Sequence, residues 1–333
     1  MRRKGIFAAM CAALLFVAIG PAFAATTLTL STPDPDNSSI TVAAQNFADL
    51  VKKASNGEVE IKVFPNGTLY GGDPGAAVKQ LGGGSLDMLL LSASLYANFK
   101  PRFIAISVPY LFDDMDQFKS YLASDAVKQL DEDVASMRIK PLGYWPRPFR
   151  VITNSKVLIK SPADLKGIKL RVPNNPLWVE FFRAMDAAPT PMAFGEVYNA
   201  LQLAVVDGQE NPISIPMDAK FYEVQKYLTF TNHIADAWVL GMNQRKWDAL
   251  PENVKAILQE CAAQAQLDKI KYDEDGSATT EAFLKEKGME TYRLTPEEHA
   301  QFVGVAKKLY PRFGELVKDD AFYGKTLEFV GKK

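Results

Sequence analysis

The sequence predicts an α/β fold divided into two lobes, and two observations lead to this prediction. Short segments with the two-residue period of a strand alternate with longer segments that carry apolar residues at helical spacing. This order predicts mainly parallel sheets flanked by helices. The chain has 333 residues, of which 47% are hydrophobic. A chain of this size can form one large core or two smaller ones, and domain sizes favour two lobes.

The N-terminus has the three parts of a secretory signal peptide. Positive charges at residues 2–4 precede an apolar run over residues 6–19 and an Ala-Phe-Ala motif at residues 22–24. The apolar run is shorter than the roughly 20 residues that span a bilayer. Cys11 lies inside this run rather than after it, which argues against a lipid anchor. We therefore expect residues 1–24 to be removed and the mature protein to reach the periplasm, not embedded in the membrane.

Charge and cysteine content exclude several classes of function. Without residues 1–24 the chain has 35 Lys and Arg against 39 Asp and Glu, a net charge of −4. A slightly acidic surface argues against nucleic acid or an anionic membrane as a partner. Cys261 is then the only cysteine, so no disulfide is expected within the chain. Its place in an amphipathic helical segment indicates a small buried side chain rather than a reactive thiol.

The segments before residue 140 alternate between strand and helix. Strands are expected over residues 26–31, 59–63 and 87–91, and helices over 42–54, 73–81 and 115–137. A run of three glycines, residues 82–84, follows the second of these helices. No Lys-Ser or Lys-Thr comes after it, so we interpret the run as a helix C-cap rather than a phosphate-binding loop.

The rest of the chain predicts how the lobes are connected. Strands are expected over residues 139–145, 149–154, 168–172, 229–233 and 237–243, a long helix over 251–288, and a last pair of helices after a capping box at 295–298. Pro146 and Pro148 interrupt the first pair of strands, and we expect a crossing between lobes there because the two prolines stiffen the chain without supplying ladder donors. Because no flexible linker or repeat is present, we expect several crossings. Lobe I is assigned to residues 25–148 and 237–277, and lobe II to 149–236 and 278–333.

The stretch from residue 164 to 212 contains the first candidate for a binding residue. Arg171 lies on a short strand and leaves on the face opposite the aliphatic residues at 168, 170 and 172. An aromatic-Gly-Glu helix start at 194–196 and a predicted turn over 207–211 follow it. Spacing alone leaves two interpretations of Arg171 open, a solvated strand residue or a fixed guanidinium.

Several segments of the chain carry a resemblance to a known family. They are FPNGTLYGG (64–72), VPYLFDD (108–114), KGIKLRVP (166–173), PTPMAFGEVYNALQ (189–202), VDGQENP (206–212) and FYEVQKYLTFTNH (221–233). In this order they resemble the substrate-binding proteins of TRAP transporters, the DctP-type family, over the whole mature chain. The resemblance implies a fold like that of periplasmic binding proteins, no cofactor, and delivery of a small organic acid to a membrane permease.

The resemblance also implies roles for individual residues. Arg171 would grip the ligand carboxylate, because a guanidinium offers the parallel N–H donors that lysine lacks. Arg150 would be a second arginine at the ligand, and Asn211 would bridge the carboxylate and an arginine. Phe194 would pack on the ligand, and His233 matches a position that touches ligand in some members.

Further candidates bear on which acid is bound. Trp145 and Trp238 lie near predicted crossings, where an aromatic ring can stack on the C–H face of a sugar acid. Arg147 could lie in the cleft instead of Arg150 or beside it, although the family gives it no firm role. The sialic-acid binders of the family carry an acid and an arginine where this chain has Ser92 and Leu95. We therefore expect a sugar acid such as a uronate or aldonate, with a C4-dicarboxylate as the alternative and Ser92 as a polar contact.

The sequence gives little support to catalysis. It holds two histidines and no G-x-S-x-G, H-E-x-x-H or C-x-x-C motif, so neither catalytic residues nor metal ligands are expected. The rival hypotheses are an exported hydrolase that uses two carboxylates, a sensor subunit that delivers the same ligand to a receptor, and a structural secreted domain.

Overall fold

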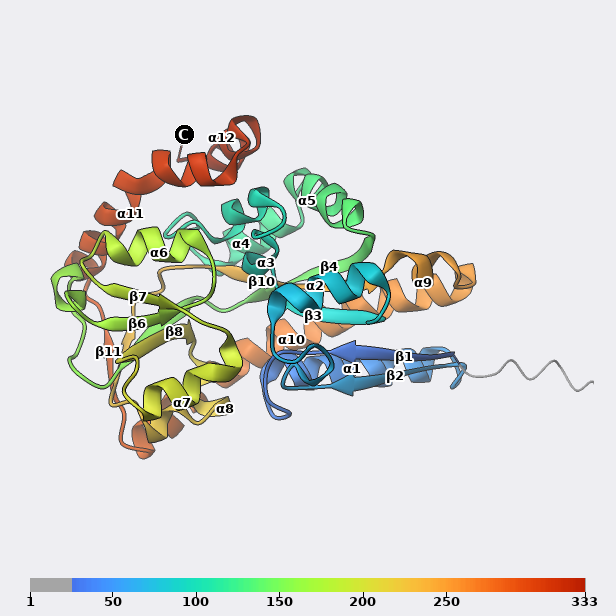
Figure 1. Ribbon diagram of the computed structural model, residues 1–333, viewed down its shortest axis with the longest axis horizontal. Coiled ribbons are helices and arrows are strands. Elements are labelled where there is room, and N and C mark those ends of the chain that lie inside the picture. Colours follow the sequence, from blue (N-terminus) through green and yellow to red (C-terminus); the bar gives the residue numbers. More distant parts are fainter. Residues whose placement is uncertain (1–25, 333) are drawn as a thin grey trace, which may run out of the picture.

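The computed structural model describes residues 26–332, and the predicted signal peptide lies outside them. Two sheets lie side by side, each with helices on its faces (Figure 1). The first sheet has the strand order β2 (Val59–Phe64), β1 (Thr26–Ser31), β3 (Met88–Ser92), β10 (Asp236–Asn243) and β4 (Ile139–Arg147). The second has the order β11 (Glu290–Arg293), β9 (Tyr227–Phe230), β5 (Arg150–Asn154), β8 (Gly208–Pro212), β6 (Lys169–Val172) and β7 (Ala188–Pro191).

Both sheets mix parallel and antiparallel pairs. The strands β1, β2 and β3 run parallel to one another, as do β6, β7 and β8. In contrast, β10 is antiparallel to β3 and β4, and β5 is antiparallel to β8 and β9. These antiparallel strands belong to the two places where the chain passes from one sheet to the other, between β4 and β5 and between β9 and β10. The predicted two-lobed α/β fold with interlobe crossings is confirmed.

The helices cover both sheets and join them. They are α1 (Ser39–Ala54), α2 (Pro74–Gly83), α3 (Ala93–Tyr96), α4 (Met115–Leu122), α5 (Asp125–Ser136), α6 (Pro176–Arg183), α7 (Val197–Gln202), α8 (Ser214–Asp218), α9 (Gln244–Asp248), α10 (Glu252–Glu286), α11 (Pro296–Val317) and α12 (Asp320–Phe329). Short 3₁₀ turns lie at Thr68–Tyr70, Pro101–Ser107, Pro162–Leu165, Phe194–Glu196 and Phe221–Glu223. The long helix α10 contacts α1 and β4 beside the first sheet and α8 and β11 beside the second. It therefore forms a third connection between the two halves.

The structure corrects two predicted elements. The helix expected over residues 115–137 is two helices, because Ser124 adopts an extended conformation between α4 and α5 and its hydroxyl donates to the carbonyl of Tyr121. The turn expected over 207–211 is mostly strand β8, whose five residues are all buried between β5 and β6. Asp207 ends the loop before β8, and its Oδ2 accepts a hydrogen bond from the backbone N–H of Lys169 at 2.9 Å.

Two predicted helix ends are confirmed. Gly84 has φ +89° at the C-cap of α2, and its N–H donates to the carbonyls of Gln80 and Leu81. Only glycine adopts this left-handed conformation without strain. Thr295 and Glu298 form the capping box that begins α11. Within residues 26–332, no helix combines the length and apolar character needed to cross a membrane.

Candidate functional site

A cavity of about 260 Å³ lies where the two sheets face each other. The parallel strands of both sheets point their carboxyl ends at it, the usual place for a ligand in α/β proteins. From the first sheet and its loops the lining includes Asp34, Asn66, Leu91, Ser92, Arg147 and Trp238. From the second it includes Arg150, Arg171, Asn174, Met192, Phe194 and Asn211. Three arginines thus meet in one small, largely buried space.

Arg171 is the arginine of this cavity that has no ionic partner among the described residues. It lies on β6 with 4% of its surface exposed, and its Nε and Nη2 donate to the carbonyl of Met192 at 3.2 and 2.8 Å. Burial lowers the pKa of Arg171 to about 10, so the side chain stays charged at neutral pH. Its Nη1 makes no hydrogen bond within residues 26–332. A charged fork with free donors therefore faces the cavity.

Arg150 has its charge balanced by Glu210, which lies beside it on β8. The guanidinium donates from Nε and Nη2 to both carboxylate oxygens of Glu210, the second at 2.7 Å, and from Nη2 to its carbonyl at 2.6 Å. Burial alone would raise the pKa of Glu210, but Arg150 and His233 hold it at about 2. This pair is a fixed part of the cavity wall.

His233 supports this pair from behind rather than lining the cavity. Its Nε2 lies 3.0 Å from Oε2 of Glu210 and its Nδ1 lies 2.7 Å from the hydroxyl of Thr231. The ring also stacks on Phe181. Burial lowers the pKa of His233, against the opposing effect of Glu210. Glu210 therefore contacts both Arg150 and His233, and His233 itself does not line the cavity.

The side of the cavity formed by the first sheet is held by Asp236. This fully buried carboxylate accepts hydrogen bonds from the hydroxyl of Ser92, from Nη1 of Arg147 at 3.2 Å and from the N–H of Ala237 at 2.8 Å. The guanidinium carbon of Arg147 lies 4.1 Å from the ring centre of Trp238. The charge of Arg147 is thus partly satisfied, and its plane is fixed against an aromatic face.

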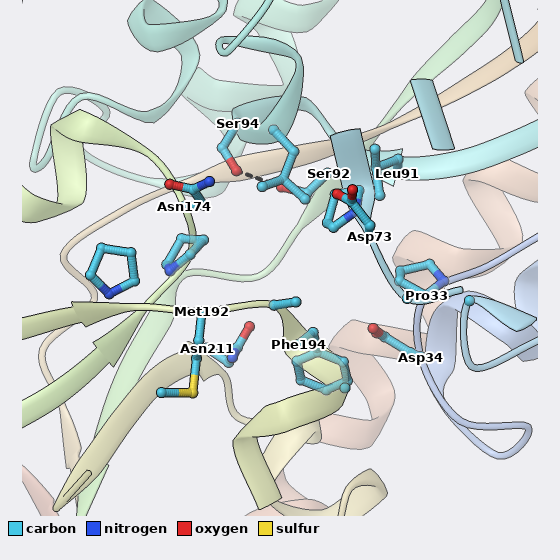
Figure 2. A pocket seen from close by; sticks show the side chains of 18 of the residues that line it. Pro33, Asp34, Asp73, Leu91, Ser92, Ser94, Asn174, Met192, Phe194 and Asn211 are labelled. Atoms are coloured by element: carbon cyan, nitrogen blue, oxygen red, sulfur yellow. Dashed lines mark hydrogen bonds between the residues drawn. The ribbon is translucent and has the colours of Figure 1, made fainter. Parts of the chain in front are cut away.

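Asn211 and Phe194 complete the wall formed by the second sheet. The side chain of Asn211 donates to Oε1 of Gln209 at 2.7 Å, and Gln209 donates in turn to the hydroxyl of Thr153 at 2.9 Å. Figure 2 shows Asn211, Met192 and Phe194 grouped on one side, with Ser92 and Ser94 across the cavity. An ordered amide and an aromatic ring therefore lie on the same wall as Arg171.

Six of the eight predicted site residues come together around this cavity. They are Arg171, Arg150, Asn211, Phe194, Trp238 and Ser92. The structure places Trp145 and His233 elsewhere. Trp145 pairs with Trp238 across β4 and β10 but lies one strand farther from β3, fully buried with its ring edge-on to Phe47. Of the two tryptophans only Trp238 lines the cavity, and from β4 it is Arg147, two residues after Trp145, that does so.

Two acids that organise the site are not among the residues predicted from the sequence. Glu210 lies inside β8, and Asp236 begins the apolar strand β10. A charged residue in the middle of a buried strand requires a buried partner. If VDGQENP is recognised as a buried strand, Glu210 within it therefore indicates a buried ionic partner.

A third acid, Asp34, lines the cavity from the loop after β1. It is 3% exposed, and its Oδ2 has no hydrogen-bond partner among the described residues. Burial raises the pKa of Asp34 to about 6, although several nearby cationic side chains lower it. Asp218, at the end of α8, has the same properties: it is buried, its Oδ2 is unpaired, and burial raises its pKa to about 7. Asp218 does not line the cavity.

Asp218→Asn should stabilise the protein at alkaline pH. The folded-state pKa of Asp218 is raised, by burial and then by Asp34 and Asp273, while the backbone of Ser39 lowers it. The stability contributed by the protonated form is therefore present below the unfolded pKa of about 4 and lost as the pH rises through 7. Three pK units correspond to at most about 4 kcal/mol, and we expect about 2 kcal/mol after local rearrangement. Urea unfolding at pH 5 and pH 8 measures this.

The difference in unfolding free energy between Asp218→Asn and wild type should increase, in favour of the variant, from pH 5 to pH 8. A gain of equal size at both would show that the charge of Asp218 is not its cause.

Within residues 26–332, no group of three or more His, Cys, Asp or Glu side chains is arranged to hold a metal ion.

Comparison with known proteins gives consistent matches over most of the chain. The family model described as bacterial extracellular solute-binding protein, family 7 (DctP), matches residues 30–316. The 2,3-diketo-L-gulonate-binding periplasmic protein YiaO of Escherichia coli K12 is 34% identical over 250 residues, 75% of each chain. The sugar acid binding protein DctPAm of Advenella mimigardefordensis, solved with galactonate, is 30% identical with a TM-score of 0.88, covering 92% of this chain and 98% of that one. A TRAP periplasmic solute binding protein of Sulfurospirillum deleyianum, solved with succinate, is 29% identical with a TM-score of 0.85, covering 91% and 98%.

Proposed function

The chain belongs to the bacterial extracellular solute-binding proteins of family 7, the DctP family, and from this premise we propose that it captures a small organic acid for a TRAP-type membrane permease. The family consists of transporter binding proteins rather than enzymes. The ligand is a sugar acid such as a uronate or aldonate, with a C4-dicarboxylate as the alternative. The protein works in the periplasm after removal of residues 1–24.

The observation that carries this proposal is the unpaired charge of Arg171. Arg147 and Arg150 already have carboxylate partners in Asp236 and Glu210, whereas Arg171 has none among the described residues. A buried cation without a counterion is costly, so a ligand carboxylate that pairs with it gains the full benefit of a low-dielectric site. The free Nη1 of Arg171 gives such a carboxylate a donor.

The other lining residues supply what a short hydroxylated acid needs. Asn211 offers an amide next to the carboxylate site, and Phe194 and Trp238 offer apolar faces to its carbon chain. Ser92 adds a hydroxyl on the opposite wall. Arg150, whose charge is balanced by Glu210, lines the same wall as Arg171 with its guanidinium. Neither Trp145 nor His233 lines the cavity: Trp145 acts through packing, and His233 acts through its contact with Glu210.

Capture requires that the ligand favour one arrangement of the lobes. With lobe I formed by residues 25–148 and 237–277, and lobe II by 149–236 and 278–333, the cavity lies between them. A ligand that touches Arg171 on one side and Ser92 on the other makes more contacts in the closed arrangement, and this difference drives closure. The closed complex is then the form that the permease recognises.

The relatives support an acid ligand of this size. The similar proteins named above are described as binding 2,3-diketo-L-gulonate, galactonate and succinate. Two of these three are sugar acids, and all carry at least one carboxylate. Their common feature is the group that Arg171 can pair with.

A thermal-shift screen of the mature protein, refolded to remove bound ligand, tests the proposal. The panel holds uronates, aldonates, C4-dicarboxylates, keto acids and neutral sugars. We expect stabilisation by acids only, because Arg171 needs a negative partner. A compound at 100 times its dissociation constant adds about 2.7 kcal/mol to the unfolding free energy.

The screen also separates the rival functions. Stabilisation by neutral sugars alone would contradict the role of Arg171, and consumption of a stabilising acid by the purified protein would point to an enzyme instead.

A further inference from the structure

We propose that Asp34 selects the class of acid that is bound: its carboxylate accepts hydrogen bonds from hydroxyl groups at the end of the ligand away from Arg171, and it excludes a second carboxylate from that place. This inference rests on the proposed function and deepens it. It names hydroxylated monocarboxylates as the substrate class and dicarboxylates as the class rejected.

The backbone of Asp34 is held firmly at the mouth of the first sheet. Its carbonyl accepts hydrogen bonds from the N–H of Asn66 at 2.9 Å and from the hydroxyl of Thr41 at 3.3 Å. Figure 2 shows the carboxylate pointing toward the side of the cavity where Phe194 and Asn211 lie. The side chain is therefore presented to the ligand by a fixed loop.

The acceptor atom of Asp34 lacks a partner of its own. Oδ2 is buried and makes no hydrogen bond within the described residues. Buried acceptors are nearly always paired in folded proteins, since an unmade hydrogen bond to a buried group is costly. Asp133 and Asp218 also have a buried Oδ2 without a hydrogen bond, but Asp34 is the one of these three aspartates that lines the cavity. A hydroxyl donor on the ligand supplies the missing hydrogen bond to Oδ2 of Asp34.

The charges of the cavity then decide which donor fits. Among the described residues that line the cavity, Arg147 and Arg150 have carboxylate partners, whereas Arg171 on the second sheet has none, and Asp34 on the loop after β1 is a buried carboxylate whose Oδ2 makes no hydrogen bond. A polyhydroxy monocarboxylate places its negative end at the cation and its hydroxyls at the anion. A dicarboxylate places a second negative charge beside a buried aspartate, where repulsion is weakly screened. Ser92 and Asn66, also on this side of the cavity, are polar but uncharged. Asp73, the other carboxylate of the lining, is exposed at the N-cap of α2, where its Oδ1 accepts a hydrogen bond from the N–H of Gly75 at 2.8 Å.

Calorimetry of wild type and Asp34→Asn, each with galactonate and with succinate, tests the inference. The substitution keeps the shape of the side chain and removes its charge. We expect affinity for galactonate to fall by about 10- to 100-fold, because hydrogen bonds to a charged acceptor are lost. Affinity for succinate should stay the same or rise. The preference of wild type for galactonate over succinate should thus fall at least tenfold.

Asp218→Asn is the matched control, since it removes an equally buried aspartate outside the cavity. The preference of Asp218→Asn for galactonate over succinate should equal that of wild type. Thermal unfolding checks that each variant is folded, and Asp34→Ser repeats the test with a smaller neutral side chain.

Three results would overturn the inference. They are a preference in Asp34→Asn within threefold of wild type, a wild-type preference for succinate, and tighter binding of 4-aminobutanoate than of galactonate, which would assign Asp34 to an ammonium group. If acids bind and depend on Arg171 while Asp34→Asn has no effect, this inference alone fails. If wild type binds no acid, the proposed function fails as well.

Discussion

Arg171→Ala should weaken binding of the organic acid by about 2–5 kcal/mol, because the ligand carboxylate then lies in a buried site without its counterion. Among the cavity arginines, only Arg171 has a charge that is free to pair with the ligand. Calorimetry with galactonate, or with the acid that stabilises most in the thermal-shift screen, gives the difference directly.

Two further variants sharpen this test. Arg171→Lys keeps the charge but loses the planar fork, so we expect an intermediate affinity. Arg183→Ala removes an exposed arginine at the end of α6 and should leave affinity unchanged. An Arg171→Ala protein that binds within threefold of wild type would remove this residue from the binding site.

Glu210→Gln should destabilise the folded protein by about 3–5 kcal/mol, since it leaves the buried charge of Arg150 uncompensated. The folded-state pKa of Glu210 is lowered to about 2. The stability that ionised Glu210 contributes is therefore fully present above the unfolded pKa of about 4.5 and is lost as the pH falls toward 2. The difference from wild type should be constant between pH 5 and 8 and shrink below pH 4.5. Urea unfolding across this range measures both statements.

The exposed Glu290→Gln is the control for Glu210→Gln, and it should stay close to wild type. Replacing Arg150 by Met together with Glu210 by Leu should recover much of the loss, because no uncompensated charge remains. If Glu210→Gln costs less than 1 kcal/mol, the pair does not hold the wall of the cavity as we infer.

Local periodicity was sufficient to predict most elements, and long-range pairing explains what it missed. The strand that carries Arg171 follows from alternation, and the end of α2 follows from Gly84. The role of Glu210 depends on Arg150, 60 residues away, and that of Asp236 on Ser92, 144 residues away. No window of sequence contains both partners of either contact. Resemblance to a family supplied Arg150 and Asn211, but it did not indicate that Arg150 already has a partner.

The position of β10 in the first sheet has a consequence for how the chain reaches its native state. This strand lies between β3 and β4, and within residues 26–332 β4 pairs with no other strand of the sheet. The first sheet therefore cannot be completed until residue 243 is available, long after its first strand at residues 26–31 has been synthesised. Such non-local pairing delays folding. A chain that acquires its tertiary structure late stays unfolded for longer. An unfolded polypeptide can pass through a narrow translocation pore and fold on the other side.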